Sequence, residues 1–112
     1  MQHLTKDGVL IIYLTGSLLS DDVSKDVAKL LEKTIVTGNK RLLFNLQEVK
    51  FMNSTGLLVV LLASGIIGRA KGEMALCYVP EQVKKIIRLI KLESVLTCLA
   101  DEDSAIEFLK AA

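Results

Sequence analysis

The stretch that decides the fold is Phe51-Met52-Asn53-Ser54-Thr55-Gly56-Leu57, which separates two long apolar runs. Before it, Arg41–Leu46 is apolar without alternation, a pattern typical of a strand that is buried on both faces. After it, the residues from Leu57 to Ile67 are almost all apolar, and this run is too long for a typical strand. The sequence therefore predicts a buried strand, a short loop and a buried helix that packs on the sheet.

The loop contains three residue types that cap helices, Asn53, Ser54 and Thr55. A side-chain oxygen at such a position accepts a hydrogen bond from an amide of the first helical turn. The same amides and the helix dipole favour negative charge, so a phosphate carried on a hydroxyl would be stabilised there. From the residues alone two interpretations stay open: the hydroxyls only cap the helix, or one of them accepts a phosphate.

Strands and helices alternate along the rest of the chain. Strands are expected at Met1–Thr5, at Gly8–Thr15 where Gly16 ends the strand, at Glu73–Val79 and within Leu92–Leu99. The dipeptide Asp7-Gly8 signals a hairpin between the first two. The alternation predicts one α/β domain over residues 1–112, with a mostly parallel sheet of about four to five strands and helices packed against it.

The other helices are predicted from their ends and their apolar spacing. One begins at Ser20-Asp21-Asp22 and ends at Gly38 as a left-handed cap, and Gly72 ends the helix that follows the loop. A third follows Pro80 as a first-turn proline, and a last helix covers Asp101–Leu109. The side chains expected inward are Val23, Val27, Leu30, Leu31 and Thr34 in the first of these, Val83, Ile86, Ile87 and Ile90 in the third, and Ala105, Ile106 and Leu109 in the last.

Composition excludes several classes of function. With 14 basic and 13 acidic residues the net charge is +1, which gives no electrostatic reason to expect nucleic acid or an anionic membrane as a partner. Aromatic residues are 4% and Trp is absent, so no base-stacking platform is visible. Leu57–Ile67 is shorter than the roughly 20 apolar residues that span a bilayer. Without a basic segment and apolar core at the N-terminus, we expect a cytoplasmic protein with no membrane insertion.

The chain lacks the residues and motifs that most catalytic sites use. Cys77 and Cys98 lie in apolar runs and are expected to be buried free thiols. His3 is the one histidine, so a metal site has no ligand set and Ser54 has no base to activate it as a nucleophile. No phosphate-binding glycine loop or nucleophile elbow is present. We expect a protein that is not an enzyme and uses no cofactor or metal.

The segment Asn53-Ser54-Thr55-Gly56-Leu57 resembles the Asp-Ser-Ser/Thr-Gly-Leu motif of the STAS-domain family, specifically the bacterial anti-sigma factor antagonists. Further segments resemble the family in the same order: Leu14-Thr15-Gly16, Phe44-Asn45-Leu46 with Val49–Met52, and Gly72-Glu73-Met74 with Val79–Lys84. The resemblance covers most of the chain and implies a single STAS domain over residues 1–112.

The resemblance also implies a regulatory switch. A partner serine kinase, which is also an anti-sigma factor, would phosphorylate Ser54, and a phosphatase would reverse this. The unmodified chain would bind that kinase and free a sigma factor, whereas the phosphorylated chain would not bind. Asn53 stands where the family has aspartate, and this favours an alternative function as a phosphorylation-independent STAS scaffold subunit of a signalling or lipid-transport assembly.

A partner-binding surface follows from these positions. Its residues are Asn53, Ser54, Thr55, Gly56, Leu58 and Leu62, with Ser20 and Asp21 from the earlier loop. Helical spacing places Leu58 and Leu62 on one outward face, where another helix covers them or they form a docking patch for the kinase or for a second copy in a homodimer. A second basic set, Lys84, Lys85, Arg88 and Lys91, forms a solvated face or meets an acidic partner.

Overall fold

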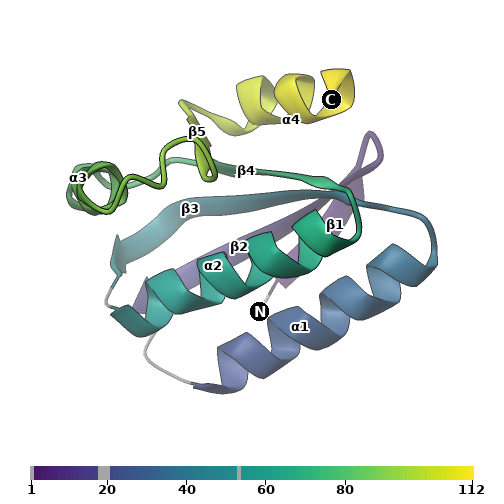
Figure 1. Ribbon diagram of the computed structural model, residues 1–112, viewed down its shortest axis with the longest axis horizontal. Coiled ribbons are helices and arrows are strands. Elements are labelled where there is room, and N and C mark those ends of the chain that lie inside the picture. The colour runs from purple at the N-terminus through teal and green to yellow at the C-terminus, as the bar shows by residue number, and fades with distance from the viewer. Residues whose placement is uncertain (1, 18–20, 53) are drawn as a thin grey trace.

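The described part of the chain, residues 2–17, 21–52 and 54–112 of the computed structural model, alternates strands and helices (Figure 1). At residues 16–17, 21–24, 50–51 and 54–55 only the backbone is described, and not the side chains. In chain order the elements are β1 Gln2–Lys6, β2 Val9–Ser17, α1 Asp21–Val36, β3 Arg41–Phe51, α2 Ser54–Arg69, β4 Glu73–Cys77, α3 Glu81–Leu89, β5 Thr97–Leu99 and α4 Glu102–Ala111.

The five strands lie side by side in the order of the sequence, β1-β2-β3-β4-β5. β1 pairs antiparallel with β2, and each later neighbouring pair is parallel. A helix lies in each parallel connection; α1 and α2 cover one face of the sheet, and α4 covers the other (Figure 1). The predicted α/β fold with a mostly parallel sheet of four to five strands is confirmed.

The hairpin at the start has the geometry that its sequence predicts. Asp7 and Gly8 both have positive φ, 54° and 77°, as a two-residue hairpin turn requires. The predicted end of the next strand at Gly16 is wrong, because β2 continues to Ser17. Gly16 and Ser17 pair with Val49 and Phe51 of β3, with a shift in register between the two pairs. Pairing with a longer neighbour therefore extends β2 past the glycine.

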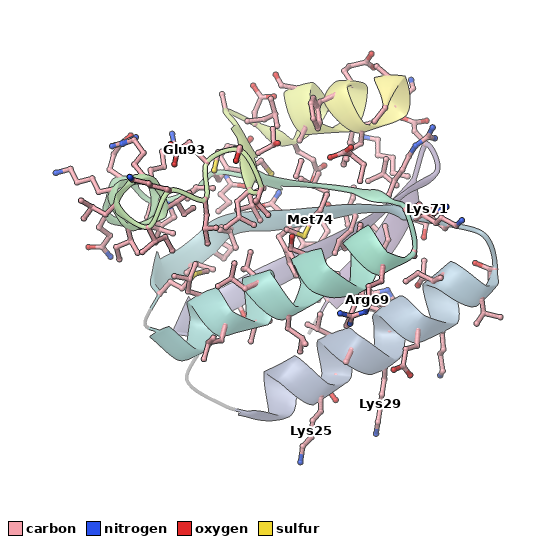
Figure 2. The ribbon with its side chains drawn as sticks, in the orientation of Figure 1. Lys25, Lys29, Arg69, Lys71, Met74 and Glu93 are labelled. Atoms are coloured by element: carbon pink, nitrogen blue, oxygen red, sulfur yellow. The ribbon has the colours of Figure 1, made fainter. Side chains whose placement is uncertain are left out.

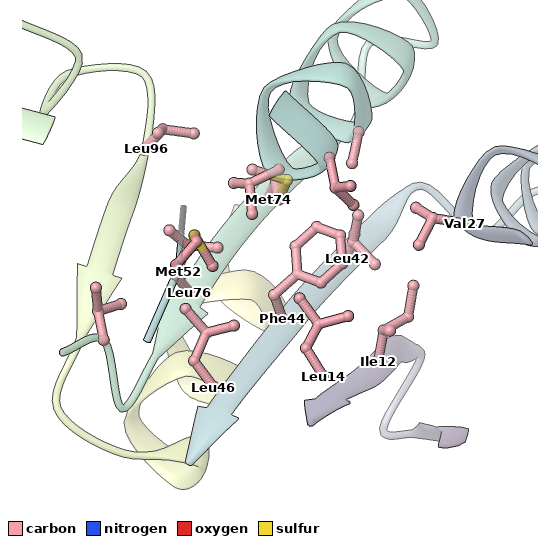
Figure 3. Packing of buried hydrophobic residues seen from close by; sticks show 14 of the residues in the cluster. Ile12, Leu14, Val27, Leu42, Phe44, Leu46, Met52, Met74, Leu76 and Leu96 are labelled. Atoms are coloured by element: carbon pink, nitrogen blue, oxygen red, sulfur yellow. The ribbon is translucent and has the colours of Figure 1, made fainter. Parts of the chain in front are cut away.

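Two apolar cores flank the sheet because the side chains of each strand alternate between its faces. Leu42, Phe44 and Leu46 of β3 enter the larger core, which α1 and α2 cover, and Figure 3 shows this packing. Leu43 enters the smaller core under α4. The predicted burial on both faces is confirmed for Leu42–Leu46, but β3 continues past this predicted short strand to Phe51, and Gln47 and Glu48 are exposed. From α2 the larger core takes Val59, Val60, Ala63 and Ile67, and from α1 it takes Val27 and Leu31.

Two helix ends show different uses of glycine. Gly38, with φ of 95°, ends α1 as predicted, and its amide donates to the carbonyl of Ile35 at 2.9 Å. The helix predicted to end at Gly72 is α2, whose last residue is Arg69, and the left-handed residue after it is Lys71, with φ of 61°. Gly72 is required for another reason: a Cβ there would collide with Lys40, which precedes β3.

The region around α3 departs most from the predictions. β4 ends at Cys77, two residues early, because Tyr78 has φ of 55° and turns the chain. Pro80 is the N-cap of α3 and not a first-turn residue. Val83 and Ile87 are buried as predicted, but Ile86 and Ile90 are wrong as inward residues, since 39% and 45% of their surfaces are exposed. The adjacent β5 has only three residues, so the sheet offers α3 a narrow surface.

The C-terminal elements agree with the predictions. β5 lies within the predicted segment Leu92–Leu99, and α4 begins one residue after Asp101. The Asp101 carboxylate accepts a hydrogen bond from the Ser104 amide at 2.8 Å and caps the helix. The three residues predicted inward, Ala105, Ile106 and Leu109, are all buried against the sheet.

Candidate functional site

The predicted partner-binding residues belong to segments that meet at one edge of the sheet. β2 and β3 are parallel, and their last residues, Ser17 and Phe51, are register partners. The helices that follow them, α1 from Asp21 and α2 from Ser54, lie beside one another on the same face (Figure 1). The parallel pairing thus brings together the ends of β2 and β3, which are more than thirty residues apart in the sequence. Ser20 and Asn53 themselves lie outside the described residues.

The start of α2 is the electropositive end of a buried helix. Ser54 and Thr55 are its first two residues by backbone conformation, and their side chains are outside the description. Met52 before the helix and Gly56 within its first turn are buried. The first turn contains no acidic residue, so no carboxylate of this turn neutralises the positive end of the helix dipole. The backbone here favours an anion, as the sequence predicts.

An apolar surface continues along α2 from this point. Leu58 is 62% exposed and Leu62 is 41% exposed, while Val59, Val60 and Ala63 of the same helix are buried. Leu58 lies one turn after Ser54, about 6 Å along the helix axis. Residues four apart lie on the same face of a helix, so the two leucines form one outward stripe. No other helix covers this stripe in the described part of the chain, which agrees with the outward placement that the spacing predicts.

A polar cluster on the opposite face attaches α4 to the sheet. The Tyr13 hydroxyl donates to Oε1 of Glu102 at 2.7 Å, and the Asn45 amide donates to the same oxygen at 3.0 Å. Burial and the hydrogen bond with Glu102 raise the pKa of Tyr13 to about 12. This cluster was not predicted from the sequence, because Glu102 lies far from both partners in the chain. Asn45 is a buried amide in an apolar strand, and its position there was a sign that a polar partner must lie nearby.

The two cysteines are free, as expected, and differ in burial. Cys77 in β4 is buried as predicted, whereas the predicted burial of Cys98 is wrong, because its strand β5 is partly exposed along its whole length. Burial raises the pKa of both thiols, that of Cys77 to about 12. Thiols with raised pKa values are poor nucleophiles and poor metal ligands at neutral pH. Over the described residues, no cluster of three histidine, cysteine or acidic side chains has a spacing that would hold a metal.

A surface depression lies at the other edge of the sheet. Its volume is about 620 Å³, and it is lined by residues at the starts of β3 and β4 that include Lys40, Lys71 and Glu73. Parallel strands β3 and β4 begin at this edge and end at the edge where α2 starts, so the depression is remote from Ser54. Within the described ranges, no helix is long and apolar enough to cross a membrane.

The chain is similar in sequence to proteins named as anti-sigma factor antagonists. The chain is 26% identical over 106 residues to "Putative anti-sigma factor antagonist BtrV" of Bordetella bronchiseptica, covering 95% of this chain and 90% of the relative. It is 28% identical over 101 residues to "Anti-sigma F factor antagonist" of Paenibacillus polymyxa, covering 88% and 85%.

A solved structure has the same fold. The Bacillus cell fate determinant SpoIIAA in its phosphorylated form superposes with a TM-score of 0.74 at 23% identity, covering 96% of each chain. The family model for the STAS domain matches residues 1–105. The match extends from β1 into α4 and includes both segments at the edge where α2 begins. This chain therefore belongs to the STAS domain family.

Proposed function

We propose that this chain is an anti-sigma factor antagonist, a non-enzymatic cytoplasmic regulator that binds an anti-sigma factor and thereby releases a sigma factor. The names of the two relatives, which this chain covers over most of their length, support the proposal. The observation that carries it is the exposed stripe of Leu58 and Leu62 directly after Ser54, the first residue of α2. Apolar surface of this kind is typical of an interaction site.

The interface that we propose is centred on the start of α2. It contains Asn53, Ser54, Thr55, Gly56, Leu58 and Leu62, with Ser20 and Asp21 from the neighbouring segment. The exposed leucines would be buried against the partner, and each fully buried leucine contributes about 1.5–3 kcal/mol. The same stripe is where a second copy of the chain would pack if a homodimer forms.

Phosphorylation of Ser54 by the partner, acting as a serine kinase, would switch the complex off, and a phosphatase would restore it. A phosphate adds about −1.5 to −2 charges at one point. The start of α2 stabilises that charge within the chain, so the fold need not change. The partner, in contrast, would have to desolvate it, and a loss of about 3 kcal/mol lowers affinity roughly 100-fold. A protein of the same fold has been solved in a phosphorylated form.

A second candidate function rests on Asn53. The family motif has aspartate at this position, and asparagine cannot provide a carboxylate during phosphate transfer. In that case the chain would act as a phosphorylation-independent scaffold subunit, and the surface beside Ser54 would be a permanent contact.

Incubation of the purified chain with its kinase partner and ATP separates the two functions. For the switch we expect one phosphate, mapped to Ser54 by mass spectrometry, and at least about 100-fold weaker binding to the kinase by calorimetry. Ser54→Ala should abolish incorporation, and Thr55→Ala, which removes the neighbouring hydroxyl, should not. Tight binding without any incorporated phosphate would instead establish the scaffold.

A further inference from the structure

Strand β1 is an edge of the sheet that the fold leaves uncovered. The strand order places β1 outside β2, and in the described part of the chain no strand pairs with its other side. All five residues of Gln2–Lys6 are exposed, so the helices on the two faces of the sheet leave β1 open to solvent. A free strand edge offers amides and carbonyls to any strand that approaches it.

The sequence of β1 has few of the features that protect a free edge from pairing. Proteins usually keep such an edge short, or interrupt it with proline, a bulge or charged residues. The opposite edge of the sheet, β5, is short, with three residues. β1 has five residues in continuous register with β2, no proline, and one lysine at its end, Lys6. Of the two edges, β1 is therefore the one suited to pairing.

The hairpin geometry determines which backbone groups of β1 point outward. Asp7-Gly8 is a two-residue turn, so the residues that flank it, Lys6 and Val9, form a hydrogen-bonded pair. Hydrogen-bonded and non-hydrogen-bonded pairs alternate along an antiparallel ladder, so every second residue before Lys6 also bonds to β2. The amides and carbonyls of His3 and Thr5 therefore point the other way, toward the free edge.

We propose that β1 pairs antiparallel with β1 of a second copy of this chain, in the register that places Leu4 opposite Leu4 on a two-fold axis. In this register His3 of each copy lies opposite Thr5 of the other. Both of these pairs are hydrogen-bonded pairs, with two backbone hydrogen bonds in each. The pairing joins two five-stranded sheets into one continuous sheet, and because the contact is isologous it closes as a dimer.

The side chains of β1 favour this register over its neighbours. Leu4, which is 44% exposed, meets Leu4 of the second copy in a non-hydrogen-bonded pair, where side chains come closest. Lys6 lies opposite the neutral Gln2, so no like charges face each other. With Thr5 on the axis, Lys6 would instead lie opposite Leu4, and with His3 on the axis two histidines would meet. The proposed register is thus the one that brings the leucines together with no charge against them.

The surroundings of β1 leave room for a second strand. One shallow depression of about 280 Å³ lies between His3 and α1, and another of about 390 Å³ lies beside Leu4 and Tyr13. In the two-fold pair the α1 helices of both copies lie on the same face of the joined sheet. Figure 2 shows that Lys25 and Lys29 extend from α1 away from the sheet, so these charges point away from the joined strands.

Two other contacts compete with this one. The stripe of Leu58 and Leu62 is the other surface on which two copies could meet. β2 separates β1 from β3, the strand that leads into α2, so pairing through β1 leaves that stripe free for another protein. The inference therefore does not depend on the function proposed for Ser54. An extended segment of another protein could also add to β1. We favour a second copy because its own strand supplies the matching leucine and the neutral residue opposite Lys6.

Analytical ultracentrifugation of the chain between about 10 µM and 1 mM tests the proposal. We expect a reversible equilibrium between monomer and dimer with a Kd in that range, because a contact of one strand pair is at the small end of specific interfaces. A chain that stays monomeric up to about 1 mM, or that forms larger assemblies, would overturn the proposal.

Amide hydrogen exchange followed by nuclear magnetic resonance identifies the edge that pairs. At a concentration about ten times the Kd, roughly a fifth of the chain is monomeric, so exchange of the His3 and Thr5 amides should slow about fivefold relative to a dilute sample. The amides of Leu4 and Lys6 already bond to β2 and should exchange at an unchanged rate. Dimerisation that leaves the exchange of His3 and Thr5 unchanged would overturn the proposal.

Matched variants locate the contact. Thr5→Pro removes an outward amide that β2 does not use, so it should weaken the dimer at least about tenfold while Tm stays within a few degrees. Leu4→Lys sets like charges together on the axis and should weaken the dimer as much. Val36→Lys, the matched change at an 87% exposed position of α1, should leave it unchanged, as should Leu58→Glu. A dimer that dissociates with Leu58→Glu and persists with Leu4→Lys would place the contact on α2 and overturn the proposal.

Discussion

Substitution of Gly72 tests a close backbone approach between two turns of the chain. Gly72 lies between α2 and β4 and passes directly against Lys40, which precedes β3. A Cβ at position 72 would lie 2.8 Å from the Lys40 Cβ and closer still to its carbonyl oxygen. The same carbonyl accepts a hydrogen bond from the Glu73 amide at 2.9 Å, next to the first register pair of β3 and β4. Gly72→Ala must therefore push two backbone segments apart.

The expected cost follows from these contacts. A backbone carbonyl cannot rotate away as a flexible side chain can, and overpacking of this kind costs about 1–3 kcal/mol. Loss of the hydrogen bond from Glu73 adds about 1 kcal/mol. Gly72→Ala should therefore lower the free energy of unfolding by about 2–4 kcal/mol, which for a chain of this length lowers Tm by roughly 10–20 °C.

Urea and thermal denaturation followed by circular dichroism measure this effect, and the chain offers a matched control. Gly68 is an exposed position in α2 where an added Cβ would meet nothing within 4 Å. Gly68→Ala should leave stability unchanged or raise it by about 0.5–1 kcal/mol, because alanine is the better helix former. If Gly72→Ala unfolded at the same midpoint as the unmodified chain, or if Gly68→Ala were the less stable variant, the reasoning would be refuted.

Three further predictions concern the site and the α4 attachment. Ser54→Asp should weaken binding of the anti-sigma partner in calorimetry while Tm stays within a few degrees, since its charge lies at a helix N-terminus; a large fall in Tm with unchanged binding would contradict this. Leu58→Glu should weaken the same complex without unfolding the chain, whereas the buried Val60→Glu should unfold it, as circular dichroism will report. Stability in urea should fall between about pH 10 and pH 12, because Glu102 and burial raise the pKa of Tyr13 from 10.0 to about 12 and the folded state keeps a proton that the unfolded chain releases. Tyr13→Phe should remove that part of the decline, and an unchanged decline would show that Tyr13 is not its source.

The candidate site could be predicted from the sequence only in part. The motif at residues 53–57 and the spacing of Leu58 and Leu62 are local patterns, and they located the start of α2 and the outward leucines. The pairing of Ser17 with Phe51 brings the start of α1 to the same edge, and it follows from the sheet order. The exposure of Ile86 and Ile90 was not predicted, because these isoleucines have the same spacing as buried residues.

Elements with local causes can be predicted from the order of residues alone. The Asp7-Gly8 hairpin needs two residues that tolerate positive φ, and Gly38 ends α1 for the same reason. The apolar run of Arg41–Leu46 indicates a strand buried on both faces whatever lies above and below it.

Features that depend on a distant neighbour could be seen only once the chain was folded. β2 continues past Gly16 because β3 is there to pair with it, and Gly72 is needed because Lys40 lies against it. Ile86 stays exposed because β5, the strand that follows α3, has only three residues, which leaves little sheet surface to cover the helix. Chain position and hydrophobicity describe one segment at a time, whereas burial is a property of two surfaces that meet.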